Sequence, residues 1–517
     1  MIPYPAHVEP GDGALLLDAA LVIHAGARAS HEAQELARAI TVRTGLTPTV
    51  RTSEASDTSP GPSTIRLRLD PDTGLGAEAY TLRTDASGAE IVAATTAGLQ
   101  YGAQTLVQTI ATPTYDATPT DDATPTHDAT PTHDTSWHLP HLTVEDAPRF
   151  AYRGMMLDVA RQFFSVEDVC AVIDRAASLR LNHLHLHLSD DQGWRLQIDA
   201  WPRLTGPATD ASGGFYSKDD YRRIVEHAAA RHMTVVPEID MPGHTHAVGI
   251  AYPELVEAPV ITEMLRAQVA ELGQAVPEAG VPFTGWAVGF SSLRIGDETV
   301  DRFVHDVLRE LAELTPGPYL HIGGDEALGT APADFAAFVR RTAQVVREVG
   351  KVPITWHEAG AAPELPAGTI GQYWGFVAPQ DGHDDLARAF VRNGGGVILS
   401  PADAVYLDMK PDAESTLGLT WANGPTSLRR AYDWEPLAVV EGLTEHDILG
   451  VEAALWTETV ETLADIDDLA FPRIAAAAEI AWSTPPAMSS ARTWASFRER
   501  VDALTPAWRA AGIGGAQ

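Results

Sequence analysis

From Ala151 onward, short apolar runs of strand type alternate with stretches of helical spacing. The helical spacing is clearest at 166–179, 218–232 and 332–350. Strands that alternate with helices in this way pair in parallel, and eight such units close into a barrel. The alternation therefore predicts a (β/α)8 (TIM) barrel with a long, irregular stretch at 401–449. The runs expected to form its strands are 151–159, 182–188, 233–239, 318–324, 352–357, 369–375, 396–400 and 450–456.

The residues before the barrel predict a small N-terminal domain of α/β or α+β type over 1–147, which leaves 148–517 for the barrel domain. Residues 111–134 repeat a six-residue unit four times, with one proline and two threonines in each copy. Such a segment buries too little apolar surface to offset its ordering entropy, so we expect a mobile, low-complexity loop. The N-terminal elements expected are helices at 30–45 and 96–110 and strands at 63–70, 89–94 and 137–146.

Acidic residues outnumber basic residues by 70 to 36, which gives a formal net charge of −34. Non-specific binding to nucleic acid or to anionic membranes requires a basic surface, so we expect neither partner. No apolar run approaches the roughly 18 residues that a membrane-spanning helix needs. The sequence leaves the oligomeric state open.

The chain has one cysteine, Cys170, which excludes an internal disulfide and a cysteine-rich metal site. It falls in a stretch of helical spacing and is expected to be a small core residue. Residues 1–13 lack a basic region followed by an apolar region, so no secretory signal is predicted and the expected location is cytoplasmic. A chain processed ahead of Met1 would give the same pattern.

Each predicted barrel strand ends in polar, charged or aromatic residues that do not suit a core. The C-terminal ends of all eight strands meet on one face of such a barrel, where catalytic groups gather. Carboxylates with several tryptophans suit a sugar, because indole packs against the apolar face of a pyranose ring and carboxylates bind its hydroxyls. No glycine-rich phosphate loop is present. The strand-end residues are Asp158 and Arg161; Asp190 and Asp191; Asp240 and His244; Asp325 and Glu326; Trp356, His357 and Glu358; Trp374; Tyr406 and Asp408; and Trp456 and Glu458.

Ten stretches spread in order over 145–483 resemble glycoside hydrolase family 20, the β-N-acetylhexosaminidases. The resemblance implies a small α/β domain ahead of a catalytic barrel. It also implies a retaining exo-enzyme that removes terminal β-linked GlcNAc or GalNAc from an amino-sugar oligosaccharide or glycoconjugate. HIGGDE is a strong signal by itself, and the ten stretches together are highly specific. Among them are YRGMMLDVARQFFS (152–165), LNHLHLHLSDDQGWRL (181–196), VVPEIDMPGHTHA (235–247), YLHIGGDEA (319–327) and FPRIAAAAEIAWS (471–483).

In this family the 2-acetamido oxygen of the substrate attacks its own anomeric carbon and gives an oxazolinium intermediate, an exception to hydrolysis by two carboxylates. The resemblance assigns Glu326 as the acid and base, Asp325 as the acceptor of the acetamido N–H, and Tyr406 as the donor to the acetyl oxygen. It implies no metal and no cofactor.

The resemblance assigns the remaining strand-end residues to substrate binding. Arg161 is expected at the O3/O4 edge of the terminal sugar, where a guanidinium fork suits paired hydroxyls. The other binding roles fall to Asp408 and Glu458 at O4 and O6, to Trp356, Trp374 and Trp456 as pocket walls, to Trp421 at the pocket edge, and to Asp190 and His244 in a charge network that holds Asp325.

Two alternatives stay open from the residues alone. One is a glycosidase on the same barrel with a protein carboxylate as nucleophile, and the other is a sugar-binding protein without catalysis. The segment 258–280 is longer and more helical than the family's usual loop, and is expected on the aglycone side or at a subunit contact. The residues expected to be buried rather than functional are His183, His185, His187, Trp194, Trp434 and Trp482.

Overall fold

The computed structural model describes residues 1–52, 63–111, 137–206 and 213–514. The predicted loop at 111–134 lies outside these ranges, apart from Ala111. The chain divides into two compact units, which are described separately. The first comprises Met1–Pro148 with Ser496–Gly512, and the second comprises Arg149–Ala495 with the chain from Ile513. The sequence predicts a single boundary at 147/148, whereas the late segment 496–512 groups with the first unit.

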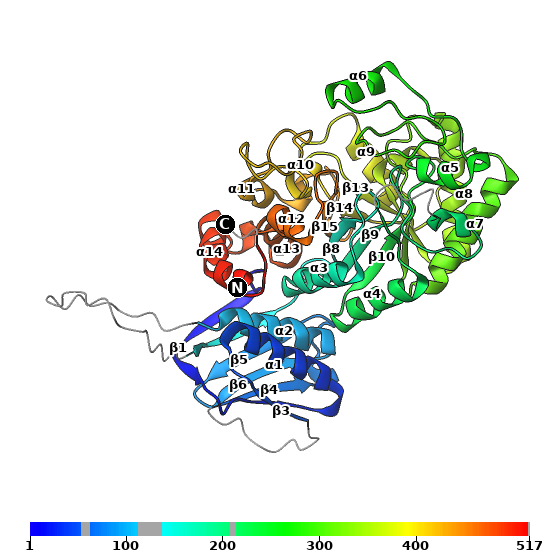
Figure 1. Cartoon of the computed structure of the whole chain (residues 1–517). Helices are drawn as coiled ribbons and strands as arrows, with labels where there is room; N and C mark the ends of the chain where they lie inside the picture. The colour runs from blue at the N-terminus through cyan, green and yellow to red at the C-terminus, as the bar shows by residue number, and fades with distance from the viewer. Residues whose placement is uncertain (53–62, 112–136, 207–212, 515–517) are drawn as a thin grey trace, which may run out of the picture. The chain divides into compact units, whose positions relative to one another are not determined.

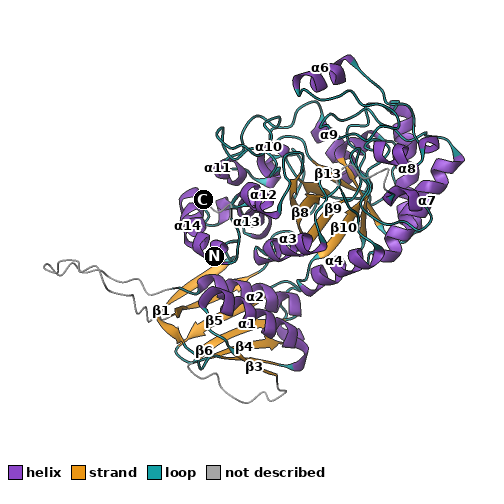
Figure 2. Ribbon diagram, viewed as in Figure 1, coloured by secondary structure: helices purple, strands orange, loops and turns teal. Residues whose placement is uncertain are grey.

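The first unit is a seven-stranded mixed sheet with helices packed on it. Figure 2 shows α1 and α2 together across one face of this sheet. The sequence did not predict β1, in which Pro10 and two glycines interrupt the alternation and the pairing register shifts. Along the sheet the strands are β1 (His7–Leu17), β7 (Trp137–Asp146), β5 (Tyr80–Asp85), β6 (Gly88–Ala93), β4 (Thr64–Leu69), β2 (Val22–Ala25) and β3 (Thr49–Thr52), and the helices are α1 (Ser30–Thr44), α2 (Thr96–Thr109) and α14 (Trp494–Ala510).

The second unit is a closed barrel of eight parallel strands, in which the last strand pairs with the first. All eight runs expected from the sequence form these strands, so the predicted fold class is confirmed. Apolar residues, among them Val236, Ile354 and Ile398, fill the barrel beside the aromatic ring of Tyr152. The strands are β8 (Tyr152–Asp158), β9 (His183–His187), β10 (Thr234–Glu238), β11 (Tyr319–His321), β12 (Val352–Trp356), β13 (Ile370–Tyr373), β14 (Val397–Leu399) and β15 (Ile448–Leu455).

The helices of the second unit lie outside the barrel strands (Figures 1 and 2). Ser165 starts the first of them with a capping box, in which its side chain and that of Asp168 satisfy each other's backbone N–H groups. The helices are α3 (Val166–Ser178), α4 (Lys218–Ala230), α5 (His246–Ala251), α6 (Glu263–Glu271), α7 (Glu298–Leu314), α8 (Pro332–Glu348), α9 (His383–Arg392), α10 (Ala402–Val405), α11 (Leu428–Tyr432), α12 (Leu463–Ala470) and α13 (Arg473–Trp482).

Most residues expected in the core are buried. Trp194, Trp434 and Trp482 are buried, and the guanidinium groups of Arg153 and Arg180 each lie 4.9 Å from the ring of Trp482. Cys170 differs from the expectation: it is only half-buried, because it flanks the fully buried line of α3 rather than lying on it. Among the described residues, every helix is too short or too polar to cross a membrane.

Closure of the barrel depends on a glycine. Gly450 of β15 pairs with Tyr152 of β8, and a Cβ at position 450 would overlap the backbone oxygen of Tyr152. We expect Gly450→Ala to lower the free energy of unfolding by about 1–3 kcal/mol or more, because overpacking forces the two strands apart. The measurement is urea unfolding followed by tryptophan fluorescence. Gly26→Ala is the control, since nothing lies within 4 Å of its added Cβ, and equal midpoints for the two variants would contradict the close approach.

Candidate active site

A cavity of about 510 Å³ lies at the C-terminal ends of the barrel strands. This volume is within the usual range for a small-molecule site. Of the predicted site residues, only Asp190, His244 and Trp356 do not line it. The lining residues are Arg161, Gln268, Glu271, Leu272, Trp286, Val288, Asp325, Glu326, Trp374, Tyr406, Asp408, Leu419, Thr420, Trp421, Trp456 and Glu458.

Two glycines bring Asp325 and Glu326 to the cavity directly after β11. Gly323 and Gly324 have φ values of 64° and 100°, and a Cβ on Gly323 would overlap the carboxylate of Asp240. The backbone N–H of Gly324 donates to Asp240 Oδ1 over 3.0 Å. Glu326 itself has a φ of 41°, a left-handed conformation that costs free energy for a residue with a Cβ. The tight turn thus holds the Glu326 backbone in a strained position at the cavity wall.

Glu326 has the protonation behaviour of an acid that works near neutral pH. Its side chain is half-buried. Burial raises the pKa of Glu326 to about 7, and the neighbouring negative charge of Asp325 adds to the rise. A carboxyl group with this pKa can give up a proton and take it back at the same pH, as acid–base catalysis requires.

Asp325 is attached to a buried network of charges. Its Oδ2 lies 3.7 Å from Nε2 of His244, whose Nδ1 lies 3.1 Å from Oδ1 of Asp190. Burial alone would lower the pKa of His244, but Asp190 and Asp325 outweigh it and hold the pKa well above its usual value. His244 is therefore a cation that fixes the Asp325 carboxylate from behind.

Asp190 connects this network to Arg161, which lines the cavity. Its Oδ2 lies 2.9 Å from Nη1 of Arg161 and 2.7 Å from Nε2 of His187. Burial would raise the pKa of Asp190, but Arg161 and His244 outweigh it and hold the pKa well below its usual range. One ionised carboxylate thus orients two residues that the sequence assigned to the site, Arg161 and His244.

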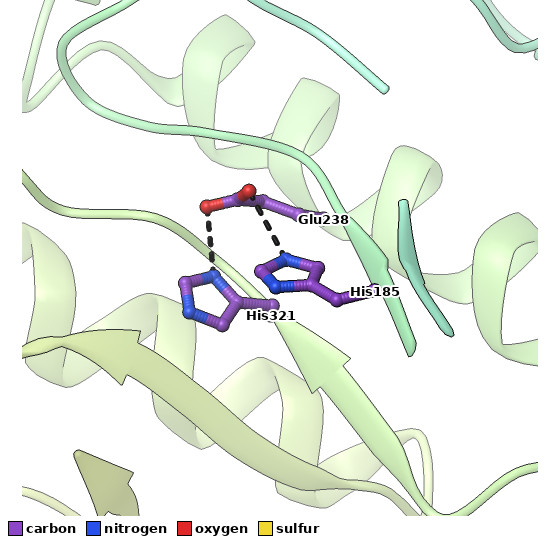
Figure 3. A group of neighbouring side chains, drawn as sticks. All are labelled: His185, Glu238 and His321. Carbon is purple, nitrogen blue, oxygen red and sulfur yellow. Dashed lines mark ion pairs between the residues drawn. The ribbon is translucent and has the colours of Figure 1, made fainter. Parts of the chain in front are cut away.

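Glu238 is a further member of the network that the sequence analysis did not identify. Figure 3 shows its carboxylate paired with two histidines, at 3.1 Å from His185 Nε2 and 2.8 Å from His321 Nδ1. The same carboxylate lies 2.5 Å from His187 Nδ1 and accepts the indole N–H of Trp356 over 2.9 Å. Its sequence signal was a glutamate inside an apolar run, VVPEI. Glu238 holds Trp356, and through His187 it also holds Asp190.

The grouping of His185, Glu238 and His321 has the residue types of a metal site. His185 also lies 2.9 Å from Glu452 through its second ring nitrogen. Burial would lower the pKa of His185, but Glu452 and Glu238 outweigh it and raise the pKa to about 9. A protonated imidazole has no free lone pair for a metal, so the group fits a cluster of buried ion pairs.

Aromatic rings surround the part of the cavity next to Asp325. The rings of Trp356 and Trp456 lie 6.0 Å apart, and Tyr406 packs against Trp456 at 6.2 Å and against Trp421 at 5.8 Å. Burial and the nearby Asp408 carboxyl hold the pKa of Tyr406 well above its usual value, so its hydroxyl keeps a proton to donate.

Trp374 is held by Glu358, which the sequence analysis names at a strand end without assigning it a role. Its indole nitrogen lies 3.0 Å from each carboxylate oxygen of Glu358. The ring of Trp374 also packs edge-on against Trp421 at 6.1 Å. Trp421 remains 47% exposed, which places it at the edge of the site rather than in the floor.

Arg161, Asp325 and Glu458, which together form the floor of the cavity, each have a buried polar atom without a hydrogen-bond partner among the described residues. The three atoms are Arg161 Nε, Asp325 Oδ1 and Glu458 Oε2. Buried polar atoms normally have partners, so these atoms are candidates to bind the hydroxyl and amide groups of a ligand. Burial and the negative charge of Glu458 hold the pKa of Asp408 well above its usual range. Asp408 is therefore suited to hydrogen bonding as a neutral acid.

A barrel with an acidic, tryptophan-lined pocket and a carboxyl group of raised pKa suits a carbohydrate-cleaving enzyme. Comparison with protein families gives the same class. The model "Glycosyl hydrolase family 20, catalytic domain" matches residues 150–334 and 328–485, and "Glycosyl hydrolase family 20, domain 2" matches residues 1–147. The chain belongs to glycoside hydrolase family 20, and it is a hydrolase with β-N-acetylhexosaminidase activity.

Two individual relatives are also β-hexosaminidases. The chain is 39% identical over 457 residues to a β-N-acetylhexosaminidase of Cellulomonas fimi, covering 87% of this chain and 83% of that protein. It is 31% identical to a β-hexosaminidase of Porphyromonas gingivalis, covering 86% of this chain and 55% of that protein.

Solved structures are similar over nearly the whole chain. A family 20 β-N-acetylglucosaminidase has a TM-score of 0.84 at 50% identity, covering 99% of this chain and 97% of that one. The Streptomyces plicatus N-acetyl-β-hexosaminidase in complex with Thio-NAglucal has a TM-score of 0.83 at 40% identity, covering 99% and 95%.

The Glu238 network generates a prediction about stability. Glu238→Gln keeps the side-chain volume but removes the negative charge that faces His185 and His187. Breaking a buried ion pair leaves a charge uncompensated, so we expect the free energy of unfolding to fall by about 3–5 kcal/mol in urea titrations. The control is Glu313→Gln, at an exposed pair with Arg309 whose loss changes stability far less. Equal effects of the two variants would show that the network contributes no more than a surface pair.

Proposed function

We propose that the chain is a retaining exo-β-N-acetylhexosaminidase that hydrolyses terminal, non-reducing β-linked GlcNAc or GalNAc with help from the substrate's own acetamido group. The observation that carries this proposal is Glu326, with a pKa of about 7, directly beside an Asp325 carboxylate that the cation of His244 holds in place. The two neighbours have different tasks because their surroundings differ.

In the first step the acetamido oxygen attacks the anomeric carbon and the glycosidic bond breaks. Protonated Glu326 gives its proton to the leaving oxygen. Asp325 accepts a hydrogen bond from the acetamido N–H and stabilises the positive charge that develops on the oxazolinium ring. The hydroxyl group of Tyr406 donates a hydrogen bond to the acetyl oxygen. The nucleophile belongs to the substrate, so correct positioning replaces a bimolecular encounter.

In the second step water attacks the anomeric carbon and opens the oxazolinium ring. Ionised Glu326 takes a proton from this water and returns to its starting state. Two displacements at the same carbon retain the β-configuration. Glu326 alternates between acid and base, which its pKa permits without a large driving force in either direction.

The floor of the cavity supports cleavage from the chain end. Arg161, Asp408 and Glu458 line the cavity, and the proposal assigns them to the hydroxyls of the last sugar. Polar side chains packed together at this end suit a sugar that ends the chain. Similar structures are described with GlcNAc as product and with Thio-NAglucal, both in the Streptomyces plicatus enzyme. These relatives support a terminal GlcNAc in the same pocket here.

The acid–base role of Glu326 gives a pH-dependent prediction. The acid form is the proton-bound form, so hydrolysis of an unactivated disaccharide is expected to fall as the pH rises through about 7. Glu326→Gln cannot transfer the proton and is expected to lose about 10²–10⁴ in kcat, together with this alkaline limb. Steady-state rates from pH 5 to 9 check both points. Glu348→Gln, an exposed residue of α8, is the control. Full activity in Glu326→Gln would overturn the assignment.

The substrate's role as nucleophile is tested separately with Asp325→Ala. We expect a loss of about 10²–10³ in kcat with a small change in KM, because Asp325 acts on charge that exists only in the transition state. Wild type should cleave an aryl N-acetylglucosaminide, should not cleave an aryl glucoside, and should be inhibited by a thiazoline mimic of the intermediate. Turnover of the glucoside would instead support a protein carboxylate as nucleophile, and sugar binding without any turnover would support a non-catalytic protein.

A further inference from the structure

The segment between α5 and α7, part of which the sequence analysis expects on the aglycone side or at a subunit contact, contributes to the cavity. It contains α6, which in Figure 1 is drawn apart from the other helices of the barrel unit. Gln268, Leu272, Trp286 and Val288 of this segment line the same cavity as Asp325 and Glu326. All the roles proposed for binding the terminal sugar belong to residues from the barrel strand ends and the loops after β14 and β15. The cavity wall formed by this segment is therefore available to contact another part of the substrate.

The segment has its own small core, which makes it a fixed wall. Thr262 caps α6 by accepting the N–H of Leu265 over 3.0 Å. Leu265 and Val269 are buried against Phe283 and Phe290, whose rings meet edge-on at 4.9 Å. Because this packing buries one side of α6, the opposite side is left for the cavity and solvent.

Trp286 is held by hydrogen bonds on both sides of its peptide. Its backbone N–H donates to Gln274 Oε1 over 2.9 Å, and the preceding carbonyl, of Gly285, accepts from Gln192 Nε2 over 2.7 Å. Gln192 is buried and follows Asp190 and Asp191 at the end of β9. The aromatic side chain therefore stands on a backbone that is tied to the catalytic end of the barrel. Preorganisation of this kind lowers the entropy cost of binding a ring.

The charge around the cavity restricts what this wall can accept. Arg161 is the only basic residue among the cavity-lining residues in the described part of the chain, against the acidic residues Glu271, Asp325, Glu326, Asp408 and Glu458. Arg161 is already paired with Asp190 at 2.9 Å. A carboxylate on the second sugar would lie beside the Glu271 carboxylate at this wall, and Arg161 would not be available to pair with it.

We propose that the segment 258–290 forms the binding site for the second sugar of the substrate, with Trp286 stacking on that sugar and Gln268 and Glu271 bonding its hydroxyl or amide groups. The site takes a neutral pyranose, such as a second N-acetylhexosamine, and disfavours a uronic acid. This inference rests on the proposed exo-cleavage, because the terminal sugar must occupy the Glu326 pocket for the next sugar to reach the wall.

The test compares methyl β-N-acetylglucosaminide, whose aglycone has no ring, with N,N′-diacetylchitobiose. We expect Trp286→Ala to raise KM about tenfold for the disaccharide, which corresponds to about 1.4 kcal/mol, and to leave the methyl glycoside within about twofold. Trp286→Phe should restore most of the loss because it keeps a ring. Met264→Ala is the control, since Met264 lies on α6, is 66% exposed and does not line the cavity.

The charge of the wall is tested with a GlcNAc-β-1,4-glucuronic acid disaccharide. Wild type should have a higher KM for this acidic disaccharide than for the neutral disaccharide. Glu271→Gln should lower the ratio of the two KM values about threefold at low salt. An unchanged ratio would overturn the preference for a neutral sugar.

The outcomes separate the two proposals. Failure of wild type to cleave either neutral substrate would refute the proposed function itself. If wild type cleaves both, an equal rise in KM for both in Trp286→Ala would assign Trp286 to the terminal-sugar pocket or to folding, and would overturn the second-sugar site. No change for either substrate would overturn it as well.

Discussion

The buried carboxylate of Glu238 and the imidazole of His187 form the contact on which the catalytic end of the barrel depends. They lie on neighbouring strands, β10 and β9, 2.5 Å apart and fully inside the barrel. His187 also contacts Asp190, and Asp190 in turn pairs with Arg161 and His244. Each charge in the series is buried and each has an opposite partner, which is the condition under which burial of charge is tolerated. A rotamer change at any one of these side chains would leave a buried charge without its partner, which costs free energy.

This network explains how Asp325 and Glu326 can have different surroundings and different roles although they are adjacent in sequence. Asp325 faces a cation that the network maintains, whereas Glu326 extends into the half-buried cavity wall, where loss of hydration raises its pKa to about 7. The strained backbone at Glu326 and the glycines before it keep the two side chains on separate courses. The rest of the barrel supplies the rigidity, because an apolar core around Tyr152, Val236 and Ile354 fixes the strands from which these loops start.

The sequence predicted the barrel because its strands are fully buried and read as continuous apolar runs, each followed by polar residues. It also predicted nine of the cavity's lining residues, from Arg161 to Glu458, since strand ends of one barrel must converge. It was weaker where short elements lacked a pattern, as in β2 and β3, and where a proline and glycines interrupt β1. The sequence flagged 258–280 as unusual, but it gave no role to Trp286, which lies beyond that stretch in a loop without periodicity.

By itself the sequence determined the fold class, the family resemblance and the set of strand-end residues, because these depend on local periodicity and on short motifs. The tertiary structure alone decided which partners those residues have. Glu238 and His187 are 51 residues apart, and Trp286 shares a cavity with Trp421 from another loop. The protonation of Glu326, His244 and His185 depends on distance and burial, which arise only when the barrel closes and brings separate strands within a few ångströms.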